Sequence, residues 1–180
     1  MNTSDRFWLT DDKEKARVRF LIEKWEDVYL SHIHEVKVEN KDGVRSTKRI
    51  RCLGDNCIAC KRGNRLINKI YIPLYNMDLQ KVQFWERTPA SQYLYFNTVF
   101  TRHDNPTSAI FEITRYGHKG DIHTKYEIVC VGDTDENLPS CEEIPNIVGN
   151  FFEIVDEYSL KQYLDKELEI LRLEAEENEI

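Results

Sequence analysis

Hydrophobic and polar positions alternate with a period of two along much of this chain, which is typical of β-strands with one face in a core. In the first such run, residues 16–22, the side chains of Ala16, Val18 and Phe20 share a face. Turn residues at 40–43 and 117–120 predict hairpins. The other alternating runs lie at residues 33–38, 48–53, 70–75, 82–86, 109–116 and 123–131.

Two segments instead show helical spacing. Thr88 and Pro89 are typical of a helix start, and this helix is expected to reach about Arg102. The second helix is acidic and amphipathic, and it runs from about Ser159 into an acidic tail at residues 174–180. Its apolar positions are Leu160, Leu164, Leu168 and Leu171.

This order of elements predicts a mainly β protein: an OB-type five-stranded antiparallel barrel with one helix before the last hairpin. A β-sandwich is the alternative, but it would not require the mid-chain helix. Pro73 cannot donate to a strand ladder, so residues 70–75 are expected at an edge or a bulge. We expect the barrel domain to span residues 1–150, with an insertion at about 52–68, and the acidic helix and tail to span 151–180.

Charge is distributed unevenly along the chain, although the formal net charge is −7. Residues 1–127 carry 22 Lys and Arg against 17 Asp and Glu, whereas residues 128–180 carry 3 against 15. From Arg45 to Lys69 there are eight basic residues and only Asp55 is acidic. This asymmetry predicts a basic working surface and an acidic tail, although a solvated basic face would give the same count.

Composition and the first residues suggest a cytoplasmic location. Hydrophobic residues make up 41% of the chain and charged residues 32%, as in ordinary globular proteins. No apolar run approaches the roughly 20 residues that cross a bilayer, and residues 1–12 show no hydrophobic signal segment. Without secretion, five cysteines favour metal ligation or buried thiols over a disulfide framework.

Cys52, Cys57 and Cys60 form a C-x4-C-x2-C cluster. Two thiolates of a C-x2-C turn can reach one tetrahedral ion, and zinc in structural sites takes four nitrogen or sulfur ligands. For the fourth ligand, His34 is preferred because its strand is expected to pair with the strand entering Cys52, and His32 on the same face is second. Cys130 and Cys141 are more distant candidates, and a cluster of buried thiols without a metal is the alternative.

A structural rather than catalytic metal is expected, because no general base of the deaminase type accompanies the cluster. The basic segment around it is too short for an apolar core of its own, so metal ligation would supply its folding free energy.

Cations and aromatic rings also coincide on the strand faces opposite the predicted core, as single-strand binding requires. Phe20, Phe84, Tyr93, Phe96, Phe100 and Phe111 are assigned to the core. The candidate DNA-binding residues are Arg17, Arg19, Arg49, Arg51, Lys61, Arg62, Tyr71, Tyr75, Trp85, Arg87, Tyr116, Lys119 and Lys125.

Seven stretches in order resemble the bacteriophage single-stranded-DNA-binding proteins of the OB-fold, zinc-containing, helix-destabilising type. They are KARVRFL (15–21), HEVKVE (34–39), RCLGDNCIAC (51–60), IPLYN (72–76), VQFWER (82–87), FEITRYGHKGD (111–121) and TKYEI (124–128). The resemblance implies a zinc ion held by His34, Cys52, Cys57 and Cys60. The spacing of the cysteines is shorter than in the T-even proteins, and Ile58 stands where family members often carry proline.

The resemblance also implies a function: sequence-tolerant binding of single-stranded DNA in phage replication or recombination, without catalysis. Expected partners are single-stranded DNA, replication or recombination proteins that contact the acidic tail, and further copies of the chain along DNA; no membrane partner is expected. Two other hypotheses stay open. One is a zinc-stabilised protein-interaction domain that acts through the acidic helix, and the other is a metal-dependent nucleic-acid enzyme.

Overall fold

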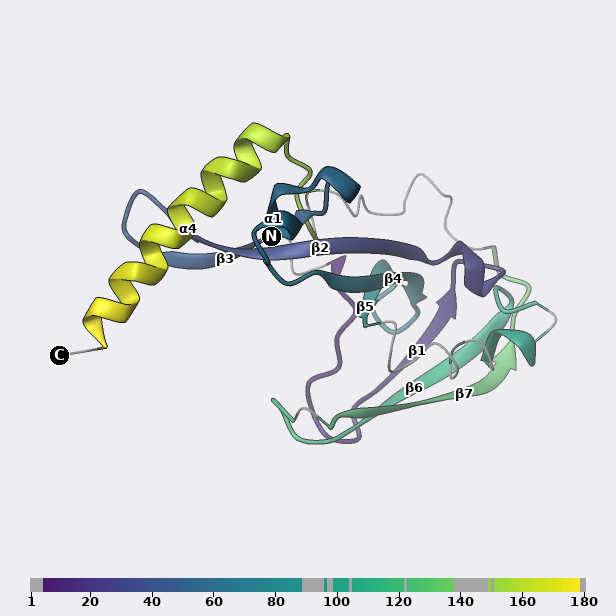
Figure 1. The fold of residues 1–180 in the computed structure, drawn as a ribbon. Coiled ribbons are helices and arrows are strands. Elements are labelled where there is room, and N and C mark those ends of the chain that lie inside the picture. Colours follow the sequence, from purple (N-terminus) through teal and green to yellow (C-terminus); the bar gives the residue numbers. More distant parts are fainter. Residues whose placement is uncertain are drawn as a thin grey trace. The chain divides into compact units, whose positions relative to one another are not determined.

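The computed structural model is mainly β, with seven strands and a long C-terminal helix (Figure 1). The chain divides into two compact units. The hairpin unit holds residues 31–68 and 146–180, and the sheet unit holds residues 2–30 and 69–145. The structure describes residues 5–88, 96, 99–103, 105–121, 123–137, 149 and 151–178.

Five antiparallel strands form the sheet unit, in the order β5-β4-β1-β6-β7. The longest ladder joins the last two strands, in which Tyr116 lies opposite Lys125 and Ala109 opposite Asp133, with a bulge between Ile110 and Phe111. The predicted final hairpin is therefore present. The bounds of the strands are β1 Lys15–Phe20, β4 Ile67–Asn76, β5 Lys81–Arg87, β6 Ala109–Tyr116 and β7 Lys125–Asp133.

An aromatic core packs against this sheet. Phe20 lies 5.1 Å from Phe111 and 5.2 Å from Phe100 between ring centroids, and Trp25 stacks on Phe96 at 5.4 Å. Residues 96 and 99–101 are helical, whereas the predicted helix start at Pro89 and the core residue Tyr93 lie outside the described residues. The other predicted core aromatics are all buried, namely Phe20, Phe84, Phe96, Phe100 and Phe111.

The expectation of a five-stranded closed barrel is wrong in two respects. The described residues contain seven strands, and among these residues β5 and β7 do not pair with each other. The strands of the predicted first hairpin belong mainly to the hairpin unit. Pro73 is also not at an edge, because β4 pairs with β5 on one side and with β1 on the other. Pro73 lies just beyond the last pair of the β1 ladder, Phe20 with Leu74, and its carbonyl still accepts a hydrogen bond from the Leu21 N–H at 3.0 Å.

The hairpin unit is built on two antiparallel strands, β2 (Tyr29–Glu39) and β3 (Arg45–Arg51), in which His34 lies opposite Ile50. A 3-10 turn, η3 (Gly54–Asn56), and a one-turn helix, α1 (Ile58–Lys61), follow β3. Buried side chains of β2, β3 and α1, together with Cys57, pack against the C-terminal helix α4 (Glu157–Glu177) in one small core. The fully buried members of this core are Val36, Ile50, Cys57, Ala59, Leu160 and Leu164.

Helix α4 begins at a capped residue, because the Asp156 carboxylate accepts a hydrogen bond from the Ser159 N–H at 2.7 Å. It continues to Glu177, so most of the expected tail at 174–180 is helical. Ion pairs at its far end explain the extension: Glu174 lies 2.5 Å from Lys37 Nζ and 3.6 Å from Arg45 Nη1. No helix among the described residues is long and apolar enough to cross a membrane.

Candidate metal centre

Three consecutive elements of the hairpin unit bring the cysteines together. Cys52 follows β3 and stays in register with β2, because its N–H donates to the His32 carbonyl at 2.8 Å. The chain then reverses through Gly54, whose φ of +81° favours glycine. Cys57 precedes α1, and its carbonyl accepts a hydrogen bond from Lys61 N–H. Cys60 lies in the same turn of helix and therefore points to the same side as Cys57.

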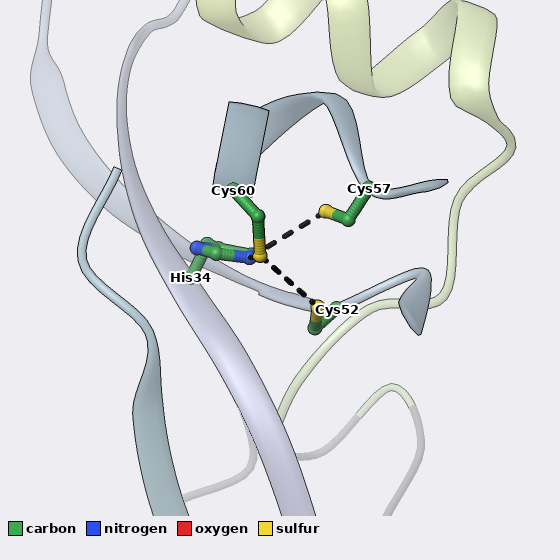
Figure 2. Close-up of side chains that lie close together, drawn as sticks. All are labelled: His34, Cys52, Cys57 and Cys60. Carbon is green, nitrogen blue, oxygen red and sulfur yellow. Dashed lines mark hydrogen bonds between the residues drawn. The ribbon is translucent and has the colours of Figure 1, made fainter. Parts of the chain in front are cut away.

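The four candidate ligand atoms form a compact group, and Figure 2 shows the three sulfurs and the imidazole converging. His34 Nε2 lies 3.5 Å from Cys57 Sγ and 3.4 Å from Cys60 Sγ, and Cys52 Sγ lies 3.6 Å from Cys60 Sγ. All four atoms are within 4.8 Å of one another. Tetrahedral bonds of about 2.3 Å to sulfur and about 2.0 Å to nitrogen require edges of similar length. The group can hold a metal ion.

His34 is prepared to act as a ligand through Nε2. Its Nδ1 lies 3.1 Å from the Arg65 carbonyl oxygen, so Nδ1–H donates there and the Nε2 lone pair faces the sulfurs. The side chain is fully buried, and this burial lowers the pKa of His34. The imidazole therefore stays neutral, as metal ligation requires.

The structure selects His34 over His32 as the fourth member of the group. His32 is exposed, and its Nδ1 lies 2.6 Å from Asn68 Oδ1 instead. Of the more distant cysteines, Cys130 belongs to the sheet unit and Cys141 lies outside the described residues.

The thiols differ in how readily they ionise. Burial opposes ionisation of Cys57, but hydrogen bonds from backbone groups of Cys60, Leu53 and Ala59 outweigh it and lower the pKa of Cys57. Burial and the neighbouring sulfurs of Cys52 and Cys57 raise the pKa of Cys60 to about 11. Several thiolates close together repel one another, and a bound divalent cation removes this repulsion.

Two of the predicted stacking residues are wrongly placed by strand alternation. Tyr71 and Trp85 are 0% and 1% exposed, because β4 and β5 are covered on both faces. Trp85 packs in T-shaped contacts on Phe7 and Phe96, which come from segments far from it in the sequence. Arg19 is also buried, and its guanidinium donates to the carbonyl of Thr107.

The remaining candidates for DNA contact fall into two groups. Several are engaged by acids: Arg17 with Asp78, Arg49 with Glu35, Arg62 with Asp165, and the Tyr116 hydroxyl with Glu127. Tyr75 is half-buried, and Arg87 lies over aromatic rings. The candidates that are exposed and have no acidic partner among the described residues are Arg51, Lys61, Lys119 and Lys125.

The sequence did not reveal how α4 contacts the segment that carries the cysteines, residues 52–68, which we call the metal loop. The buried carboxylate of Glu167 accepts hydrogen bonds from the Lys37 N–H at 2.8 Å and from Asn64 Nδ2 at 3.1 Å. It thereby joins α4 to β2 and to the residues that follow α1. Nothing in the spacing of the acidic residues along α4 distinguishes this glutamate from the exposed ones.

Comparison of the chain with protein-family models, with curated proteins and with solved structures found no match.

Proposed function

We propose that this protein binds single-stranded DNA without strong sequence preference and without catalysis, and that a structural zinc ion fixes part of its binding surface. The observation that carries the proposal is the position of three exposed cations around the candidate metal centre. Arg51 immediately precedes Cys52, Lys61 immediately follows Cys60, and the Arg65 carbonyl accepts the hydrogen bond from His34.

None of these three side chains has an acidic partner among the described residues, in contrast to Arg62 beside Asp165. A cation that is exposed and unpaired is available for a phosphate. Its attachment to a metal-bound loop lowers the conformational entropy that binding would otherwise cost. Contacts to phosphates position a strand but do not read its bases, which accounts for the proposed lack of sequence preference.

Zinc is the metal we propose, because three thiolates and one imidazole form a closed tetrahedral set typical of structural zinc. The small apolar core of the hairpin unit supports the same role, since a bound ion would supply folding free energy to the loop between β3 and α1. The resemblance to zinc-containing phage single-strand-binding proteins favours this assignment.

The acidic helix is the proposed contact for replication or recombination proteins. Its Glu174 and Glu177 lie beside Arg45 in the hairpin unit, so their removal would leave this cation available for a phosphate. Truncation after residue 173 is therefore expected to tighten DNA binding at low salt.

The test is fluorescence anisotropy of a labelled oligothymidylate at about 50 mM and 200 mM salt. Affinity is expected to fall with salt, and Lys61→Gln is expected to reduce the salt slope by about 0.7, the value for one single-strand phosphate contact. Lys41→Gln is the matched control, because Lys41 is an exposed lysine in the turn at the far end of the β2–β3 hairpin. No binding by the metal-replete wild type in the lower salt, or equal losses in both variants, would reject the proposal.

A second candidate function, a zinc-stabilised protein-interaction domain, is favoured by one observation. Helix α4 exposes three leucines among its acidic residues: Leu168 is 61% exposed, Leu171 42% and Leu173 45%. Exposed leucines of this kind suit a partner with an apolar, basic surface. This second function would be favoured if the protein bound neither oligothymidylate nor oligouridylate, and if Leu168→Asp abolished binding to a protein partner.

A further inference from the structure

Two arginines of the sheet unit lie on the same strand face as a buried apolar side chain two residues before them. Arg87 ends β5 two residues after Trp85, and Arg115 lies in β6 two residues after Ile113. Neighbours at this spacing share one face of a strand. Arg115 is only 4% exposed, and Trp85 and Ile113 are 1% and 0% exposed. Both cations are therefore drawn toward the core of this unit rather than into solvent.

The guanidinium of Arg87 lies on two aromatic rings. Its Cζ is 3.9 Å from the centroid of Tyr126 and 4.8 Å from that of Trp85. Burial lowers the pKa of Arg87, and the charge of Arg115 lowers it further, whereas Tyr126 and Glu86 raise it. A guanidinium remains protonated in proteins. The Arg87 charge is therefore poorly solvated. Arg115 lies opposite Tyr126 in the β6–β7 ladder, so a second cation is close to the same ring and repels the first.

Both side chains also keep a buried donor without an acceptor. The Nη atoms of Arg115 donate to the carbonyls of Gly117 and His118 and to the Thr124 hydroxyl. Its Nε has no hydrogen-bond partner among the described residues, and neither does Nε of Arg87. A buried donor without a partner is costly, so such atoms point to an acceptor that comes from outside the chain.

The carboxylates in this region are already engaged. Glu86 lies 3.1 Å from Lys69 Nζ and 3.8 Å from Arg6 Nη2. Glu14 interacts with the charge of Arg115, but its Oε2 accepts hydrogen bonds from the backbone N–H groups of Thr10 and Asp11. Both carboxylates thus already have other donors.

We propose that Arg87 and Arg115 form a binding site for a phosphate group in the sheet unit. A tetrahedral oxyanion accepts from several N–H donors at once and neutralises both charges, which is the recognition for which guanidinium groups are suited. A nucleobase does not fit this site by stacking, because Arg87 covers the rings of Trp85 and Tyr126. The phosphate is supplied either by the backbone of a nucleic-acid strand or by a free phosphate compound.

This inference does not depend on the proposed function of the metal loop, because the two sets of residues lie in different units. Phosphate binding at Arg87 can fail while Lys61 still contributes to DNA binding, and the reverse is also possible. The two proposals are therefore tested by separate variants.

The primary experiment compares thermal unfolding of the full chain in sodium phosphate and in sodium chloride at equal ionic strength. The midpoint is expected to rise with phosphate in the wild type, since a ligand that binds the native state stabilises it. Arg87→Gln is expected to weaken phosphate binding by about tenfold or more, as loss of a charge-assisted contact implies. In chloride the same variant is expected to be at least as stable as the wild type, because it removes a poorly solvated charge.

Arg17→Gln is the matched control, because Arg17 is an exposed arginine of the same unit that is paired with Asp78. It is expected to keep the full response to phosphate. A wild type that responds equally to both salts, or an Arg87→Gln variant with an undiminished response, would overturn the proposal.

Line broadening of inorganic phosphate in ³¹P NMR provides a direct measurement that needs no variant. Broadening by the wild type is expected, and its absence up to tens of millimolar phosphate would overturn the proposal, whether or not Arg87→Gln folds. Addition of oligothymidylate then identifies the source. Displacement of phosphate assigns the site to a nucleic-acid backbone, whereas simultaneous binding assigns it to a free phosphate compound.

Discussion

Replacement of Cys60 by serine tests the metal centre with little disturbance of packing. Cys60 is the exposed member of the cluster, so Cys60→Ser leaves no buried cavity and removes only a ligand. Structural zinc sites contribute about 10–16 kcal/mol of apparent binding free energy, or about 2.5–4 kcal/mol for each of four ligands. One tenfold change in affinity corresponds to about 1.4 kcal/mol, so the variant is expected to bind zinc about 10²–10³-fold more weakly.

The assay is competition with a chromophoric chelator, read together with thermal unfolding before and after chelation. The wild type is expected to bind one equivalent of zinc and to lose helical signal from the hairpin unit when the metal is removed. Cys130→Ser is the matched control, since Cys130 is a free cysteine outside the cluster. Wild-type affinity in Cys60→Ser, or an equal loss in Cys130→Ser, would show that the reasoning about this site is wrong.

Three further predictions follow from the same structure. Leu164→Ala is expected to destabilise the protein by about 2–4 kcal/mol in denaturant titrations, because Leu164 is 2% exposed in a small core, whereas Leu168→Ala should have little effect. Zinc affinity, measured by chelator competition, is expected to fall as the pH is lowered, because binding must displace thiol protons and the pKa of Cys60 is about 11 without metal. An affinity that does not change between pH 6 and pH 8 would contradict this. Burial raises the pKa of Asp78, but hydrogen bonds from Arg17 outweigh it and lower that pKa, so its stabilising effect is present above the unfolded-state value and is lost as the pH falls through the folded value. Asp78→Asn should therefore cost about 0.5–1 kcal/mol at pH 7 after allowance for solvent screening, and less at pH 2, in denaturant titrations at the two pH values.

The metal centre could be predicted from the sequence because its geometry is local. Three cysteines lie within one short loop, and a single strand pairing places His34 beside them. The choice between His34 and His32 needed the structure, because both side chains lie on the same face of the predicted strand. The hydrogen bond from His34 Nδ1 to the Arg65 carbonyl, which orients the ring, involves a residue 31 positions away.

The predicted exposure of the candidate stacking residues Tyr71 and Trp85 was wrong, because alternation alone could not predict their burial. Alternation identifies the face of a strand that meets its own sheet's core, but it does not reveal a second layer contributed by distant segments. Trp85 is buried because Phe7 and Phe96 reach it from opposite directions in the sequence. The barrel prediction failed for a related reason, since the buried face of β2 and β3 packs on α4, which lies more than one hundred residues further along the chain.

The carboxylate of Glu167 has a thermodynamic consequence for the whole hairpin unit. Because it accepts from the Lys37 amide and from Asn64 just beyond α1, undocking of α4 would leave donors of both β2 and the loop without their acceptor. Ion uptake by the loop and docking of the helix are therefore linked equilibria, and linkage is reciprocal. If docking of α4 raises the ion affinity of the loop by some factor, binding of the ion raises the docking equilibrium constant of α4 by the same factor.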